Sequence, residues 1–110
     1  MIDWTRVAEL RDEIGAEDFD EVIEIFLEEV NDVIDRLRAE GTHSDLEGKL
    51  HFLKGSALNL GFRDFSNLCQ QGESAAAAGN LAAIDLPATI ASFDRSKTEF
   101  LSGMERLNAA

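Results

Sequence analysis

The sequence predicts an all-α fold, an antiparallel up-down four-helix bundle with a short extra N-terminal helix. Apolar residues recur at steps of three and four along most of the chain, which is the spacing of amphipathic helices. Strand-like alternation never persists, and the breaks between the apolar repeats are short. Four amphipathic helices joined by short loops pack antiparallel. A chain of 110 residues is expected to form one domain, residues 1–110, around a single core.

The first two helices are expected at residues 4–14 and about 18–39. Asp3 is a candidate N-cap of the first helix and Gly15 is its C-terminal stop. Asp18 with Glu21 resembles a capping box for the second helix, which Gly41 closes. The second helix carries a long apolar stripe at helical spacing: Phe19, Val22, Ile23, Phe26, Leu27, Val30, Ile34 and Leu37.

Three further helices follow at residues 44–60, roughly 63–78, and from about residue 86 onward. Ser44 and Glu47 form a clearer capping box for the third helix, and Gly61 suits a left-handed stop at its end. Gly79-Asn80 breaks the chain after the fourth helix, and Asp85 followed by Pro87 marks the start of the last helix. The residues of the fourth helix expected to face inward are Phe65, Leu68, Cys69, Ala75 and Ala76. The last helix is continued by Ile90, Phe93, Lys97, Phe100, Leu101, Met104 and Leu107.

Composition excludes several classes of function. The net charge of −12, concentrated before residue 40, repels nucleic acid and anionic membranes. No apolar run approaches the length of a membrane span. The single cysteine, Cys69, is expected to be a small core residue, and the first residues lack the basic and apolar regions of a signal peptide. These features favour a cytoplasmic protein, which we expect to be a monomer.

The third helix carries the most informative residues of the chain, His51, Lys54 and Gly55. His51 falls beside the apolar stripe, and Lys54 is one turn further along the same side. Gly55 costs a helix interior about 1 kcal/mol relative to alanine, which makes sense if another molecule must approach the imidazole. A histidine at such a boundary, taken alone, is more often a solvated or half-buried residue without chemistry, and a helical glycine can simply mark close packing. The combination favours a histidine that accepts and donates a phosphoryl group.

The chemistry of phosphoryl transfer defines what each residue would do. A neutral imidazole nitrogen can attack phosphorus, and Lys54 would stabilise the charge on the transferring oxygens. No phosphate-binding loop, His-Glu-x-x-His or Cys-x-x-Cys pattern occurs, so we expect no bound cofactor, no metal site and no nucleotide site. His43 is expected to be a solvated loop residue. The phosphoryl group must then come from another protein.

A docking surface for that protein is expected around the histidine. Leu58 projects on the same side as His51, two turns along, and Phe62 either joins this patch or packs in the bundle. Lys49 and Arg63 would complete a basic island with Lys54 in an otherwise acidic chain.

The stretch His51-Phe52-Leu53-Lys54-Gly55-Ser56, followed by small or apolar residues, Gly61 and then Leu68-Cys69, resembles the signature of histidine-containing phosphotransfer (HPt) domains. The resemblance covers the whole chain. It implies that His51 is phosphorylated, that Lys54 contacts the phosphoryl group, and that Gly55 leaves room for the partner. It also implies that the partners are response-regulator receiver domains and a hybrid sensor histidine kinase, and that the receiver supplies Mg²⁺ and the aspartate.

Two positions depart from that pattern. Gly72 stands where such domains more often carry a bulky apolar residue, which would loosen the fourth helix. Glu73 stands where some relatives place a glutamine, and its role is open: near His51 it would orient and charge the imidazole but oppose an incoming phosphate. The alternative function is a non-catalytic helical adaptor that has kept the fold. The sequence names neither the cognate kinase and regulator nor the direction of phosphate flow.

Overall fold

The computed structural model describes residues 2–39 and 45–109, with side chains up to residue 106. Five α-helices occupy the described chain: α1 (Trp4–Ile14), α2 (Phe19–Ala39), α3 (Leu46–Leu60), α4 (Arg63–Ala77) and α5 (Leu86–Ala109). A short 3₁₀ turn, η1 (Leu81–Ala83), connects α4 to α5. Within these residues the sole β feature is an isolated bridge between Ile2 and Phe62. The predicted fold class is confirmed.

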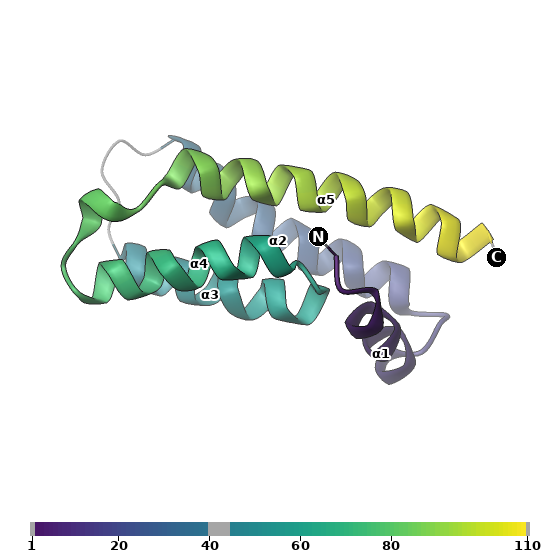
Figure 1. Cartoon of the computed structure of the whole chain (residues 1–110). Coiled ribbons are helices and arrows are strands. Elements are labelled where there is room, and N and C mark those ends of the chain that lie inside the picture. The colour runs from purple at the N-terminus through teal and green to yellow at the C-terminus, as the bar shows by residue number, and fades with distance from the viewer. Residues whose placement is uncertain (1, 40–44, 110) are drawn as a thin grey trace.

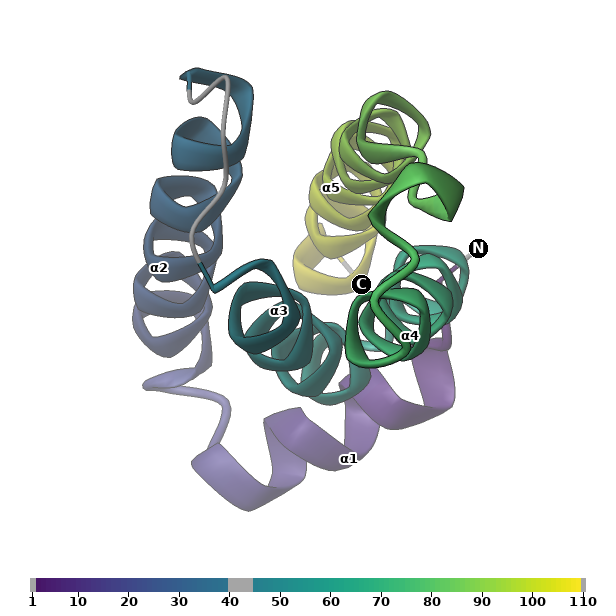
Figure 2. The same cartoon turned by 90° about the vertical axis from the view of Figure 1, so that its left-hand side faces the viewer.

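The four long helices run alternately up and down along a body of 46 × 23 × 21 Å (Figure 1). The end-on view in Figure 2 shows α3 between α2 and α4, with α5 above them. The short α1 crosses the end of the bundle at which α3 turns into α4. This arrangement leaves one outer side of the α3–α4 pair open, away from α5. No described helix is both long and apolar enough to cross a membrane.

Four helix ends follow the capping chemistry of the sequence, and one needs a correction. The side chain of Asp3 accepts a hydrogen bond from the Arg6 backbone at 3.3 Å, and Gly15 ends α1 with φ of 99°. Gly61 ends α3 in the left-handed conformation with φ of 75°. Asp85 accepts from the Ala88 backbone at 3.0 Å and so caps α5. These assignments agree with the predictions.

The predicted cap of α3 is wrong. The N-cap is Asp45, which accepts from the Gly48 backbone at 3.2 Å, and the helix begins at Leu46. Ser44 and Gly41, to which we assigned the cap of α3 and the stop of α2, lie outside the described residues. Asp45 has a left-handed backbone with φ of 52°, which aspartate tolerates better than most residues because its side chain bonds locally.

Aromatic rings fill the core where α1, α4 and α5 meet. Phe62 contacts Phe100 edge-on with ring centroids 5.4 Å apart, and Phe65 contacts Phe93 at 5.3 Å. Trp4 stacks on the same Phe100 at 5.9 Å, nearly parallel. Rings at these separations attract one another beyond the area that they bury. The N-terminal segment is anchored to this core by a backbone hydrogen bond of 2.7 Å from Asp3 N–H to the Gly61 carbonyl.

Gly72 sets the close approach of α3 and α4. It is buried, and a Cβ at this position would lie 2.9 Å from Leu50 Cδ1. Leu50 itself is fully buried in the core. The small residue therefore lies at the contact between the two helices, and our expectation that Gly72 loosens α4 stays a prediction.

Candidate functional site

His51 lies on the outer face of α3, and its side chain is 69% exposed. Its helix is held by a buried stripe comprising Leu46, Leu50, Leu53, Ala57 and Leu60. Because His51 is about 100° round the helix from Leu50, burial of Leu50 places the imidazole at the edge of the α3–α4 contact. The backbone under the histidine is therefore fixed while the ring itself meets solvent.

Glu73 of α4 bridges His51 and Lys54. Its Oε1 lies 2.8 Å from His51 Nδ1, and its Oε2 lies 2.8 Å from Lys54 Nζ. The hydrogen bonds from Lys54 and then from His51 lower the pKa of the Glu73 carboxyl below its ordinary value. Glu73 is therefore ionised at neutral pH.

The ionised carboxylate determines the tautomer of the neutral imidazole. A carboxylate without a proton can only accept hydrogen bonds, so His51 Nδ1 must donate and carries the proton. The lone pair of the neutral ring is then on Nε2, at the other side of the imidazole from Glu73. The geometry thus leaves one specific nitrogen, Nε2, with the free lone pair.

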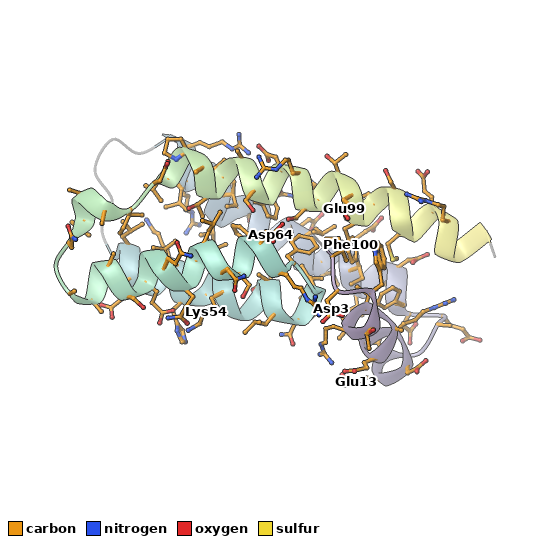
Figure 3. The ribbon with its side chains drawn as sticks, viewed as in Figure 1. Asp3, Glu13, Lys54, Asp64, Glu99 and Phe100 are labelled. Carbon is orange, nitrogen blue, oxygen red and sulfur yellow. The ribbon has the colours of Figure 1, made fainter. Side chains whose placement is uncertain are left out.

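Lys54 is held by two acceptors on α4. Besides the ion pair with Glu73, its Nζ donates to Gln70 Oε1 at 3.1 Å. Gln70 in turn donates through Nε2 to Ser74 Oγ at 3.0 Å. The side chain of Lys54 is half-buried, on the side of the α3–α4 pair that faces away from α5 (Figure 3). Glu73 therefore places the ammonium of Lys54 and the imidazole of His51 on the two oxygens of one carboxylate.

Gly55 leaves open space next to the histidine. Apart from its two chain neighbours and the adjacent backbone of α3, no atom of the described residues lies within 4 Å of a Cβ built at this position, and the residue is exposed. Gly55 is one turn beyond His51 and nearly above it. Packing within the described chain therefore gives no reason for a glycine here, in contrast to Gly72.

The residues predicted to form a docking surface have different environments. Leu58 is 59% exposed, as a docking residue requires. Phe62 is 1% exposed and packs between Phe93 and Phe100, so the prediction that it joins the patch is wrong. Phe52, which we did not select, is 40% exposed and lies on the far side of Gly55 from His51. Large exposed apolar side chains therefore flank the histidine on two sides.

The predicted basic island is not a single cluster around His51. Lys54 reaches the histidine through Glu73, as described above. Arg63 is exposed at the start of α4 and pairs with Asp3 at 3.3 Å, close to the α3–α4 turn. Lys49, two residues before His51, projects about 160° away round α3. The structure thus links Lys54 to the imidazole through Glu73 and places Arg63 at the α3–α4 turn. Lys49 projects from the opposite side of α3.

Cys69 has the properties of a core residue. It is fully buried, and burial, reinforced by the nearby charge of Glu73, raises the pKa of its thiol to about 12. A thiol that stays protonated is a poor nucleophile and a poor metal ligand. Among the described residues no group of three or more His, Cys, Asp or Glu side chains is arranged to hold a metal ion.

A helical bundle that displays one oriented histidine beside a lysine is the architecture of a phosphocarrier module. The family model described as Hpt domain matches residues 21–110, and the chain belongs to this family. Neither the curated proteins nor the solved structures that were compared with the chain gave a match. Hpt domains serve in histidine phosphotransfer within phosphorelays, where they interact with receiver domains and kinases of two-component systems.

Proposed function

We propose that His51 is the phosphorylated residue, which accepts a phosphoryl group from a receiver-domain aspartate and passes it to another receiver aspartate. One observation carries this proposal: Glu73 accepts a hydrogen bond from Nδ1 of a well-exposed imidazole, which leaves the lone pair of the neutral ring on Nε2. The chain would act as a phosphocarrier without an ATP site of its own, in the cytoplasm and as a monomer.

The transfer step balances without a cofactor bound to this chain. The lone pair of His51 Nε2 forms a bond to phosphorus, while the bond from phosphorus to the aspartyl oxygen breaks and its electron pair leaves with the carboxylate. The ring then carries Nδ1–H together with a phosphorylated Nε2, and the carboxylate of Glu73 stabilises the resulting positive charge. Transfer to the next receiver reverses the same step. The receiver would supply Mg²⁺ and the aspartate.

Lys54 would neutralise the charge of the phosphoryl oxygens. Those oxygens carry most of the negative charge in the transition state, and a preorganised cation stabilises it. Lys54 would move from Glu73 Oε2 toward the phosphoryl group while Gln70 Oε1 continues to hold it near the site. Glu73 would then interact with the charged imidazole alone.

The receiver would dock over Gly55. Leu58 and Phe52 supply apolar contact on either side of this open position, and Arg63 supplies a cation at the end of the helix pair. Exposed apolar side chains that cluster in this way commonly mark an interaction site. Lys49, which we also predicted in the docking surface, projects from the other side of α3 and would contact only a partner that wraps around the helix.

The assignment of His51 is tested by incubating the chain with a phosphorylated receiver domain and measuring acid-labile label. The His51→Gln variant should lose all label and keep its helical circular dichroism. The His43→Gln variant is the matched control and should be labelled as the wild type is. Label that persists in His51→Gln, or that disappears in His43→Gln, would contradict the assignment. Receiver binding without any labelling of the wild-type chain would identify the adaptor function instead.

The role of Lys54 is tested by the Lys54→Ala variant, with Lys49→Ala as the matched control on the other side of α3. Loss of a charge-stabilising donor should slow transfer by about tenfold or more, whereas the control should remain near the wild-type rate. Equal rates in wild type and Lys54→Ala would refute the role.

A further inference from the structure

A second surface lies at the α2–α5 edge of the bundle, distinct from the face of His51. Here α5 extends past the α3–α4 turn, and the first turns of α2 lie opposite (Figure 1). An open groove of about 340 Å³ runs between these two helices. Its apolar wall is formed by Ile23, Leu27, Leu101 and Met104. All residues that line it belong to α2 or α5, so the groove does not include any residue of the phosphotransfer site.

The groove combines an apolar wall with an acidic rim. Leu101 is 44% exposed, although it lies among core positions that are nearly inaccessible to solvent. Asp20, Glu24 and Glu105 line the same groove, and each of them is exposed. Arg106, the next residue on α5, instead borders a separate hollow beside Trp4. Among the described residues, the lining therefore offers carboxylates and apolar surface without a cation.

We propose that this groove binds a short cationic amphipathic helix of a partner protein. An apolar stripe in such a helix would cover Leu101 and Met104, and flanking Lys or Arg side chains would pair with Glu24 and Glu105. The lining residues of α2 span from Asp20 to Leu27, about 10 Å along the helix. That length accommodates two apolar anchors one turn apart, with a basic residue on either side.

Charge decides between this occupant and a second copy of the chain. The net charge is −12, and the residues at the rim of the groove are acidic, so two copies would repel each other at this surface. A cationic segment is instead attracted by the whole chain and held in place by the groove. Binding there would leave the face of His51 accessible to a receiver domain.

The test uses a fluorescent synthetic peptide of 15 residues, built from Leu and Lys in an amphipathic helical pattern, and measures its binding to the full chain by fluorescence anisotropy. The Leu101→Gln variant should bind the peptide about tenfold more weakly, a loss typical of an interface anchor. Leu101 is exposed, so this variant should keep its thermal midpoint. A peptide with Glu in place of Lys should not bind.

Matched variants separate the groove from general attraction to an acidic protein. Glu24→Lys with Glu105→Lys should weaken binding by more than tenfold, whereas Asp12→Lys with Glu17→Lys changes the net charge equally and should have a much smaller effect. Leu58→Gln, on the phosphotransfer side, should bind the peptide as the wild type does. Equal losses in the two charge-reversal variants, unchanged binding by Leu101→Gln, or a loss in Leu58→Gln would each overturn the proposal.

Discussion

Replacing Gly55 should separate the stability of the bundle from its activity. The position is in the middle of α3, where alanine is favoured over glycine by about 1 kcal/mol. An added Cβ would meet no described atom within 4 Å beyond its chain neighbours and the adjacent backbone of α3, so no steric term offsets this gain. Gly55→Ala should therefore raise the free energy of unfolding by up to about 1 kcal/mol, which raises the melting temperature of a domain of this size by about 4 °C.

Activity should change in the opposite direction. Any side chain at position 55 projects into the space beside His51 that a receiver must enter, and the obstruction grows with its size. Gly55→Gln keeps the stability gain, because glutamine is also a good helix former, but should slow phosphotransfer much more than Gly55→Ala does. Thermal melts followed at 222 nm, together with the initial rate of labelling from a phosphorylated receiver, measure the two quantities on the same samples.

Two results would refute this reasoning. A melting temperature of Gly55→Ala below that of the wild type would show that the added methyl group clashes with a neighbouring group in solution. Transfer at the wild-type rate in Gly55→Gln would show that the glycine does not provide access. His51→Gln serves as the inactive reference in these assays.

Three further predictions concern other positions. Gly103→Ala should destabilise the fold by about 1–3 kcal/mol, in contrast to Gly55→Ala, because the new methyl group would overlap the indole of Trp4; the single tryptophan should then become more accessible to acrylamide. Glu73→Gln should lower the free energy of unfolding at neutral pH, and this difference should shrink as the pH falls below about 4.3, the pKa of a free glutamate. The folded-state pKa of Glu73 is depressed, so its contribution is fully present above the pKa of the free group and is lost as the pH falls through the folded-state pKa. Cys69 should resist iodoacetamide at pH 8.5 in the folded chain and react in urea, because burial raises its pKa to about 12; rapid alkylation without urea would contradict this placement.

The local features of the sequence predicted the helices well because they act within one or two turns. The apolar stripe of α3, the left-handed stop at Gly61 and the cap at Asp3 each depend on neighbouring residues alone. The cap of α3 was harder to predict because Ser44 and Asp45 are adjacent and both suit the position. The sequence alone does not show which of the two side chains accepts hydrogen bonds from the backbone N–H groups of the first helical turn.

Phe62 shows where helical spacing ceases to apply. It follows Gly61, whose left-handed backbone redirects the chain, so the angle that relates Leu58 to His51 no longer applies to Phe62. The ring enters the core beside Phe93 and Phe100 instead. Phe52 lies about 100° round α3 from His51, and its 40% exposure depends on the packing of α3 against its neighbours, which helical spacing does not give.

The central feature of the site, the carboxylate of Glu73 between His51 and Lys54, depends on how two helices are aligned rather than on either helix alone. Glu73 lies 22 residues after His51, and no spacing rule relates the two. The packing of Gly72 against Leu50 supplies the relation, because each is the immediate neighbour of a site residue: Leu50 precedes His51, and Gly72 precedes Glu73. A larger residue at position 72 would meet Leu50 Cδ1, so that either this side chain or α4 itself would have to shift. Gly72 therefore helps to hold Glu73 of α4 at the distance from which it contacts His51 of α3.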